Sequence, residues 1–281
     1  ESKKFNNSST LRPCPNCKSR ENTLRIKEEE FLIVRCKTCG LTYLLNPPDE
    51  SEIYEDYYKI EFRGDDYREG SKFEHLREIF EINEQRTGLI KKFTSLKEDF
   101  ILLDIGCGSG LFLRSCKDAG IHGEGIDVST NALNFARKEF GLDVYNKTTK
   151  DLINEGRKYD MITMWHVLEH ITEPIDELRK IIELLSPNGY LMVEVPNLNS
   201  IKFRLSGNKW RGGNHPLYHR SFFTSKTLRE TLIKSGFKDV GRIKFSYPLS
   251  NKSFIYNLLK ITFNLFSADA FLNFTARNTN D

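Results

Sequence analysis

The sequence predicts an α/β protein with a doubly wound, mostly parallel sheet and a small metal-stabilised ribbon near the start of the chain. Three observations lead to this prediction. Two Cys-x-x-Cys pairs lie within the first 40 residues. An apolar strand, a glycine-rich turn and a helix follow from residue 100. Strands and helices then alternate as far as residue 197, which favours repeated β-α units and a parallel sheet.

Length and composition leave room for one large domain and one small one. The 281 residues are 38% hydrophobic and 29% charged, with a formal net charge of +3. That charge neither requires nor excludes an anionic partner. No apolar run is long enough to cross a bilayer, and the polar start of the sequence, ESKKFNNSST, lacks the apolar core of a signal peptide. We therefore expect a cytoplasmic protein with no transmembrane segment.

Residues 1–48 are predicted to form a zinc-ribbon. Its metal ligands would be four cysteines in two pairs, Cys14, Cys17, Cys36 and Cys39, at the spacing of a four-cysteine zinc site. Each pair directs two thiolates to one point, and two pairs complete a closed tetrahedron around a structural Zn²⁺. The alternating residues between the pairs predict a β-hairpin. Four unrelated buried thiols, or a redox pair, are the alternatives.

Residues 49–98 are predicted to be a linker and a helical cap. Pro47 and Pro48 mark the approach to the linker. From Phe73 to Phe93 the apolar residues recur with helical spacing, which predicts an amphipathic helix. This helix would lead into the main domain, residues 99–281.

The main domain opens with a nucleotide-type binding unit. The apolar run 100–105 predicts a strand buried on both faces, and Gly106, Gly108 and Gly110 follow it in a tight turn. The Gly-x-Gly-x-Gly spacing differs from the dinucleotide fingerprint, and no Gly-Lys-Ser/Thr of a P-loop is present. Asp127 ends the second predicted strand, where a carboxylate can accept both ribose hydroxyls of an adenosine.

Four segments, LLDIGCGSG, GIDVS, YDMITMWHVLEHITEP and LSPNGYLMVEVPN, resemble the ordered motifs of class I S-adenosylmethionine-dependent methyltransferases over about residues 75–245. The resemblance implies a Rossmann-like, doubly wound, seven-stranded sheet and S-adenosyl-L-methionine as cofactor. It also implies a set of cofactor-binding residues. The methionine part would lie against Asp104, Gly106, Gly108 and Gly110, the ribose against Asp127, the adenine near Lys147 and Thr148, and the sulfonium beside Trp165 and His166.

The stretch MWHVLEHITEP also spells the His-x-x-Glu-His of a zinc peptidase, through His166, Glu169 and His170. A peptidase needs its two histidines along one helix. Here His166 follows a predicted strand, at the rim where doubly wound sheets bind ligands, and Pro174 interrupts or restarts the helix. The same stretch resembles the HVLEH of a methyltransferase subgroup that acts on small molecules and sugars, which implies that His166 and Glu169 border the acceptor.

The C-terminal third departs from simple alternation. Loop 197–222 is long, aromatic and polar, and resembles a loop that closes over cofactor and acceptor. Its His215 and His219 are candidate general bases, or they hydrogen-bond the loop in place. Residues 251–268 read as a helical insertion before a last antiparallel strand, and weak membrane-surface contact is possible through 253–267.

The sequence therefore predicts a methyltransferase that acts on a small molecule or a sugar or glycan, by O- or C-methylation. His166, Glu169, His215 and His219 are the candidate catalytic residues, and Arg211 or Arg220 could pair with a substrate phosphate or carboxylate. An RNA methyltransferase that uses the ribbon for recognition is the alternative, although the nearly balanced charge counts against nucleic acid. A non-catalytic scaffold that keeps the fold is a third possibility.

Overall fold

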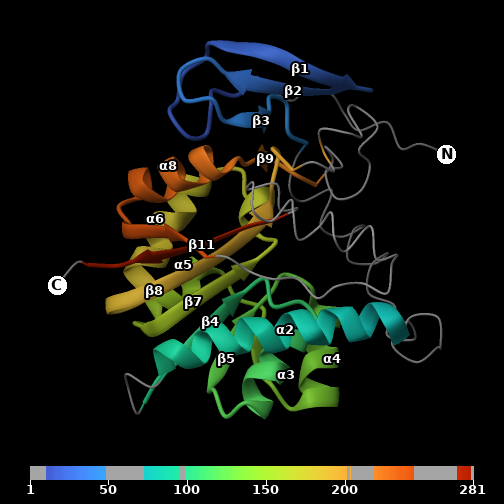
Figure 1. Cartoon of the computed structure of the whole chain (residues 1–281), viewed down its shortest axis with the longest axis vertical. Helices are drawn as coiled ribbons and strands as arrows, with labels where there is room; N and C mark the ends of the chain where they lie inside the picture. The colour runs from blue at the N-terminus through green and yellow to red at the C-terminus, as the bar shows by residue number, and fades with distance from the viewer. Residues whose placement is uncertain are drawn as a thin grey trace, which may run out of the picture.

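Figure 1 shows the fold of the chain in a computed structural model, in which residues 11–48, 73–94, 99–200, 203, 218–243 and 271–279 are described. These residues form a seven-stranded sheet and a four-stranded sheet. The predicted helical insertion 251–268 and the surface segment 253–267 lie outside the described residues. Within the described part, no helix combines the length and the apolarity that a bilayer span requires.

The seven-stranded sheet confirms the predicted fold class. Its order is β10-β11-β8-β7-β4-β5-β6. Neighbours from β8 to β6 pair in parallel, and β11 lies antiparallel between β8 and β10, as expected for the last strand. The strands are β4 (Leu102–Ile105), β5 (Gly123–Ile126), β6 (Asp143–Tyr145), β7 (Tyr159–Trp165), β8 (Leu185–Pro196), β10 (Lys238–Arg242) and β11 (Phe271–Arg277).

Helices cover both faces of this sheet (Figure 1). On one face lie α2 (Phe73–Thr94), α3 (Leu111–Asp118) and α4 (Thr130–Phe140); on the other lie α5 (Thr149–Asn154), α6 (Pro174–Leu184) and α8 (Ser225–Ser235). Two hydrophobic clusters follow, because successive strand residues point to opposite faces. Leu102 packs in the α2–α4 cluster, whereas Leu103 packs in the α6–α8 cluster.

Local signals in the sequence explain where these helices begin and end. Ser129 caps α4 by accepting a hydrogen bond from the amide of Ala132. Thr224 caps α8 in the same way through Thr227. Gly141 and Gly236 end the two helices in the left-handed conformation that glycine adopts without strain. These caps fix the ends of helices whose apolar sides cover the sheet.

The four-stranded sheet belongs to the ribbon and has the order β1-β2-β3-β9. The predicted hairpin is confirmed as β1 (Asn22–Glu28) and β2 (Phe31–Cys36), and β3 (Thr42–Leu44) pairs with β2. The fourth strand, β9 (Ser221–Phe222), comes from the end of the predicted loop 197–222 and pairs with β3. The ribbon sheet is therefore completed by a strand from the main domain, which the sequence did not suggest.

Candidate active site

The glycine-rich turn lies between β4 and α3 and holds its shape through left-handed glycines. Gly106 and Gly110 have φ angles of 70° and 78°. A Cβ at Gly106 would lie 2.4 Å from Val167 Cγ2, and one at Gly110 would lie 2.6 Å from Leu142 Cδ1. At Gly108 a Cβ would meet nothing within 4 Å. The outer two glycines thus allow close packing, while the middle one leaves open space beside the backbone.

Asp127 follows β5 and is fixed against this turn. One carboxylate oxygen accepts from the amide of Gly108 at 2.8 Å, and the other accepts from the amide of Ser129 at 2.8 Å. The residue is only 6% exposed. Burial raises the pKa of Asp127, and the backbone hydrogen bonds act in the opposite direction. Because each oxygen has a second lone pair, the carboxylate can still accept hydroxyl groups of a ligand.

A cavity of about 580 Å³ opens at the carboxyl ends of β4, β5 and β7, the edge where ligands bind in doubly wound sheets. This volume is typical of a cofactor or small-ligand pocket. The predicted residues that line it are Gly106, Gly108, Asp127, Lys147, Thr148 and His166. The structure therefore brings together residues from four separate segments of the sequence.

Lys147 and Thr148 border the cavity but also have local partners. Lys147 forms an ion pair with Glu155, 2.6 Å between Nζ and Oε1. Thr148 caps α5 and exchanges hydrogen bonds with Asp151 in a capping box. The backbone at Lys147 and Thr148 is thus held in place by contacts with α5 and its C-terminal cap.

Three of the predicted cofactor residues do not line the cavity. Asp104 is buried beneath the turn and accepts a hydrogen bond from Thr163 Oγ1 at 2.7 Å. Gly110 packs against α4. Trp165 points toward α3 and α2, with its ring 5.2 Å from that of Phe112 and the Arg86 guanidinium 4.3 Å above it. These residues support the site from below.

His166 sits directly after β7 with a left-handed φ of 59°. Its Nε2 lies 3.0 Å from Glu194 Oε1, and its Nδ1 lies 3.4 Å from Glu169 Oε1. Burial alone would lower its pKa, but the hydrogen bonds and charges of Glu169 and Glu194 raise the pKa of His166 to about 9. The ring is therefore a cation held between two buried carboxylates at neutral pH.

Glu169 and His219 lie behind the wall of the cavity, and His170 lines it. His170 Nδ1 donates to the Tyr218 carbonyl at 3.1 Å, and its ring is 4.7 Å from that of His219. Ligand atoms of Glu169, His170 and His219 all lie within 4.8 Å of one another, so this trio could hold a metal ion. His215 lies outside the described residues, as does Arg211.

Although His166, Glu169 and His170 have the spacing of a zinc-peptidase motif, they do not have its helical geometry. Residues Leu168–His170 form a single 3-10 turn, and a new helix starts at Pro174. His166 turns toward Glu194 and is not in the trio. The two histidines of the motif therefore do not face one metal along one helix.

Several residues of the site were not predicted. Tyr218, Glu177 and Lys180 line the cavity beside His170, and so does Arg220, which the sequence had already suggested as a partner of a substrate anion. Glu194 and Arg86, joined by a buried ion pair of 2.5 Å, hold His166 from beneath. One signal was available: Glu194 interrupts the apolar strand LMVEV, and a charged residue there has to find a buried partner.

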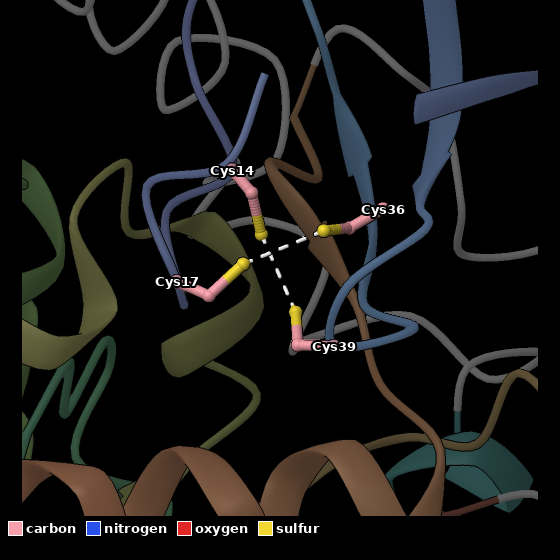
Figure 2. Close-up of side chains that lie close together, drawn as sticks. All are labelled: Cys14, Cys17, Cys36 and Cys39. Carbon is pink, nitrogen blue, oxygen red and sulfur yellow. Dashed lines mark hydrogen bonds between the residues drawn. The ribbon is translucent and has the colours of Figure 1, made fainter. Parts of the chain in front are cut away.

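The four cysteines of the ribbon converge on one point (Figure 2). Cys14 Sγ lies 3.5 Å from Cys39 Sγ, and Cys17 Sγ lies 3.4 Å from Cys36 Sγ. Tetrahedral Zn–S bonds of about 2.3 Å place sulfurs roughly 3.8 Å apart, so a small expansion admits the ion. The hydrogen bond with Cys14 lowers the pKa of Cys39 to about 4. The cluster already favours a thiolate at one of the four positions.

Arg12 ties the ribbon to the wall of the cavity. Its guanidinium donates to three carbonyls, those of Leu44 at 2.8 Å, Thr172 at 2.7 Å and Arg220 at 2.9 Å. Arg220 in turn donates its amide to the Glu169 carbonyl at 2.7 Å. The first cysteine knuckle and the segment around His170 are therefore linked through one side chain.

Comparison with known proteins agrees with this geometry. The family described as "Methyltransferase domain" matches residues 74–241. A ubiquinone biosynthesis O-methyltransferase of Cereibacter sphaeroides is 29% identical over 175 residues, 56% of this chain and 70% of that protein. One from Nitrosospira multiformis is 31% identical over 130 residues, 44% of this chain and 54% of its own length. The chain thus spans about half of this second relative.

Solved structures show the same fold. A SAM-dependent methyltransferase from Thermotoga maritima, titled a possible histamine N-methyltransferase, has a TM-score of 0.54 at 18% identity and covers 80% of this chain and 99% of its own. A SAM dependent methyltransferase from Archaeoglobus fulgidus has a TM-score of 0.50 at 19% identity, over 82% of this chain and all of its own. With the glycine turn, Asp127 and the rim cavity in place, the chain belongs to the methyltransferase domain family and is a SAM-dependent methyltransferase.

Proposed function

We propose that this enzyme transfers a methyl group from S-adenosyl-L-methionine to a hydroxyl of a small molecule, with sugars and glycans within the same acceptor class. One observation carries the proposal: the open backbone at Gly108 and the carboxylate of Asp127 face the same 580 Å³ cavity as His166 and His170. The curated relatives named O-methyltransferases support oxygen as the methylated atom.

The cofactor side of the cavity would be formed by the turn and the second strand. The space beside Gly108 admits the donor against the backbone, and Asp127 would accept the ribose hydroxyls with its free lone pairs. Lys147 and Thr148 would lie beside the adenine. The bound cofactor would supply an activated methyl group, so the protein has to bring a nucleophile in line with it and exclude water.

The acceptor side would be formed by His166, His170, Tyr218 and Arg220. His166 is a fixed cation, so its part would be to orient an acceptor oxygen rather than to take its proton. His170 would accept that proton, because it lines the cavity and its Nδ1 is already fixed on the Tyr218 carbonyl. His219 lies behind His170 and would hold it by ring contact. Arg220, which lines the cavity, would pair with a phosphate or carboxylate of the acceptor.

Isothermal titration calorimetry with S-adenosyl-L-methionine tests the cofactor site. Asp127→Asn should weaken binding by tenfold or more, because its NH₂ group donates only and would face the amide of either Gly108 or Ser129, so one of the two hydrogen bonds is lost. Asp143→Asn, an exposed residue at the start of β6, is the matched control and should bind as the wild type does. Equal binding by the two variants would contradict the assignment of Asp127.

Transfer of a labelled methyl group tests the acceptor class. Cell extract is separated into a small-molecule fraction and an RNA fraction, and each is incubated with the enzyme and labelled S-adenosyl-L-methionine. We expect label in hydroxyl-bearing small molecules. Label only in RNA would overturn the acceptor assignment, while leaving the cofactor site in place.

We further propose that the four cysteines hold one structural Zn²⁺. Elemental analysis should find one zinc ion per chain, and Cys39→Ser should lose it. A full complement of zinc in that variant would point to another set of ligands.

A further inference from the structure

A second and larger cavity lies between the ribbon and α8. Its volume is about 1230 Å³, above the range of most small-molecule pockets. One wall comes from β1, β2 and the second cysteine knuckle, and the other comes from the exposed side of α8. It shares no lining residue with the cofactor cavity. Figure 1 shows the ribbon strands above β9 and α8, which places this groove at the ribbon end of the molecule.

The floor of the groove is apolar and continuous with a small hydrophobic cluster. Ile33 and Phe222 are buried there, and Ile26 and Leu198 pack against them. Leu24 on the ribbon side and Ile233 on the α8 side are 59% and 44% exposed. They are two of the five large hydrophobic residues that are exposed in the described chain, and they stand on opposite walls of one groove. Such a pairing is typical of an interaction surface.

The rim of the groove is basic. Five cations line it, namely Arg25, Arg35, Lys37, Lys226 and Lys234, against two carboxylates, Glu28 and Glu230. Lys226 lies 3.8 Å from Glu230 in an exposed pair. The other four cations form no ion pair within the part of the chain that the structure describes. A chain with a net charge of only +3 therefore concentrates uncompensated positive charge around an apolar floor.

We propose that this groove docks an acidic amphipathic helix of a protein partner. An apolar floor between basic rims complements a helix with leucine-like residues on one face and carboxylates on its flanks. Nucleic acid fits less well, because stacking of bases requires exposed aromatic faces; of the two phenylalanines in the lining, Phe222 is only 6% exposed and Phe203 is half-buried. A flat lipid surface fits less well, because Ile33 and Phe222 of the floor are buried whereas the cations of the rim are exposed.

Fluorescence anisotropy tests the proposal with a defined probe. The probe is a stapled 18-residue helical peptide with leucines on one face and glutamates on the other, labelled with fluorescein. Its counterpart carries lysine in place of glutamate. The full chain should bind the glutamate peptide at least tenfold more tightly than the lysine peptide, and the difference should shrink as salt is raised.

The chain offers matched control variants on the same two elements. The test variant is Arg25→Glu with Lys234→Glu, one change on each wall of the groove. The control is Lys27→Glu with Arg229→Glu, exposed residues on the same strand and helix that do not line the groove. Both variants change the net charge equally. The test variant should lose at least tenfold in affinity, and the control should lose less than twofold. Thermal melting and zinc content show that both variants fold.

Three results would overturn the proposal. The first is no preference for the glutamate peptide, or equal losses in the two variants. The second is tighter binding of a 20-nucleotide poly-uridylate, weakened only by the test variant, which would assign the groove to nucleic acid. The third is the same pattern with vesicles containing 30% phosphatidylglycerol, which would assign it to a membrane surface.

Discussion

Nε2 of His166 lies 3.0 Å from Oε1 of Glu194, and Arg86 binds the same carboxylate oxygen from α2. Glu194 is fully buried, so its charge depends on these two partners. A histidine at the end of β7 is thereby fixed by a helix that precedes the whole sheet in the sequence. The orientation of His166, and with it the proposed acceptor side of the cavity, depends on a salt bridge beneath it.

Glu194→Gln should destabilise the protein because it leaves the Arg86 guanidinium buried without its anion. We expect a loss of roughly 3–5 kcal/mol in the free energy of unfolding, measured with guanidinium chloride. Adding Arg86→Met should recover part of this loss, because the unpaired charge is removed. A double variant that is no more stable than Glu194→Gln alone would contradict the importance of this pair.

Gly106→Ala should lower the free energy of unfolding by more than the strain of a left-handed alanine alone predicts. Gly106 and Gly156 have φ angles of 70° and 69°, but a Cβ at Gly156 would meet nothing within 4 Å. Gly156→Ala should therefore cost only about 1–2 kcal/mol of unfolding free energy. Gly106→Ala should cost more and abolish cofactor binding by calorimetry, and adding Val167→Ala should restore part of both. Equal effects at the two glycines would argue against the contact with Val167.

Arg12→Lys should loosen the link between the ribbon and the wall of the cavity. The carbonyls of Leu44, Thr172 and Arg220 are bound by three different nitrogens of Arg12, and the single nitrogen of a lysine cannot take all three positions. Each lost hydrogen bond to a charged group is worth roughly 1.5–3 kcal/mol. Hydrogen–deuterium exchange should rise around residues 166–172 and 218–223 while zinc content stays unchanged. Arg20→Lys, an exposed residue in the same segment, should leave exchange as it is. Unchanged protection in Arg12→Lys would show that β9 alone holds this wall.

Asp104 should make stability depend on pH. Burial raises the pKa of its carboxyl to about 7, against the opposing hydrogen bond from Thr163. The folded protein holds the Asp104 proton more tightly than the unfolded chain does. Protonated Asp104 therefore contributes to the free energy of unfolding, and this contribution is present in full below the unfolded pKa of about 3.9. It is lost as the pH rises through 7. Urea unfolding should show the wild type losing stability relative to Asp104→Asn between pH 4 and pH 7, and parallel curves would contradict this.

The sequence predicted the elements whose signals are local. Apolar runs predicted β4, β5 and β7, and three closely spaced glycines predicted the turn that follows β4. The spacing of four cysteines predicted the cluster that the structure shows. The cap at Ser129 is a local feature of the same kind, because capping needs only the neighbouring backbone.

Features that depend on contacts between distant residues were not predicted. β9 is two residues long and exists because β3 offers it a partner. Asp104 was expected against the cofactor, but its side chain points to Thr163 on the neighbouring strand. The clamp around His166 needs Arg86 and Glu194, which are far apart in the sequence and meet only once the sheet has formed.

The pairing of β3 with β9 also bears on the order in which the newly made chain matures. Tyr43 pairs with Ser221, which leaves the ribosome about 180 residues later. The cysteine knuckles are complete once Cys39 has emerged, but the outer edge of β3 stays open until Ser221 and Phe222 have been made. Closing that edge positions the stretch from Tyr218 to Arg220, so the wall of the cavity forms long after the ribbon hairpin can fold.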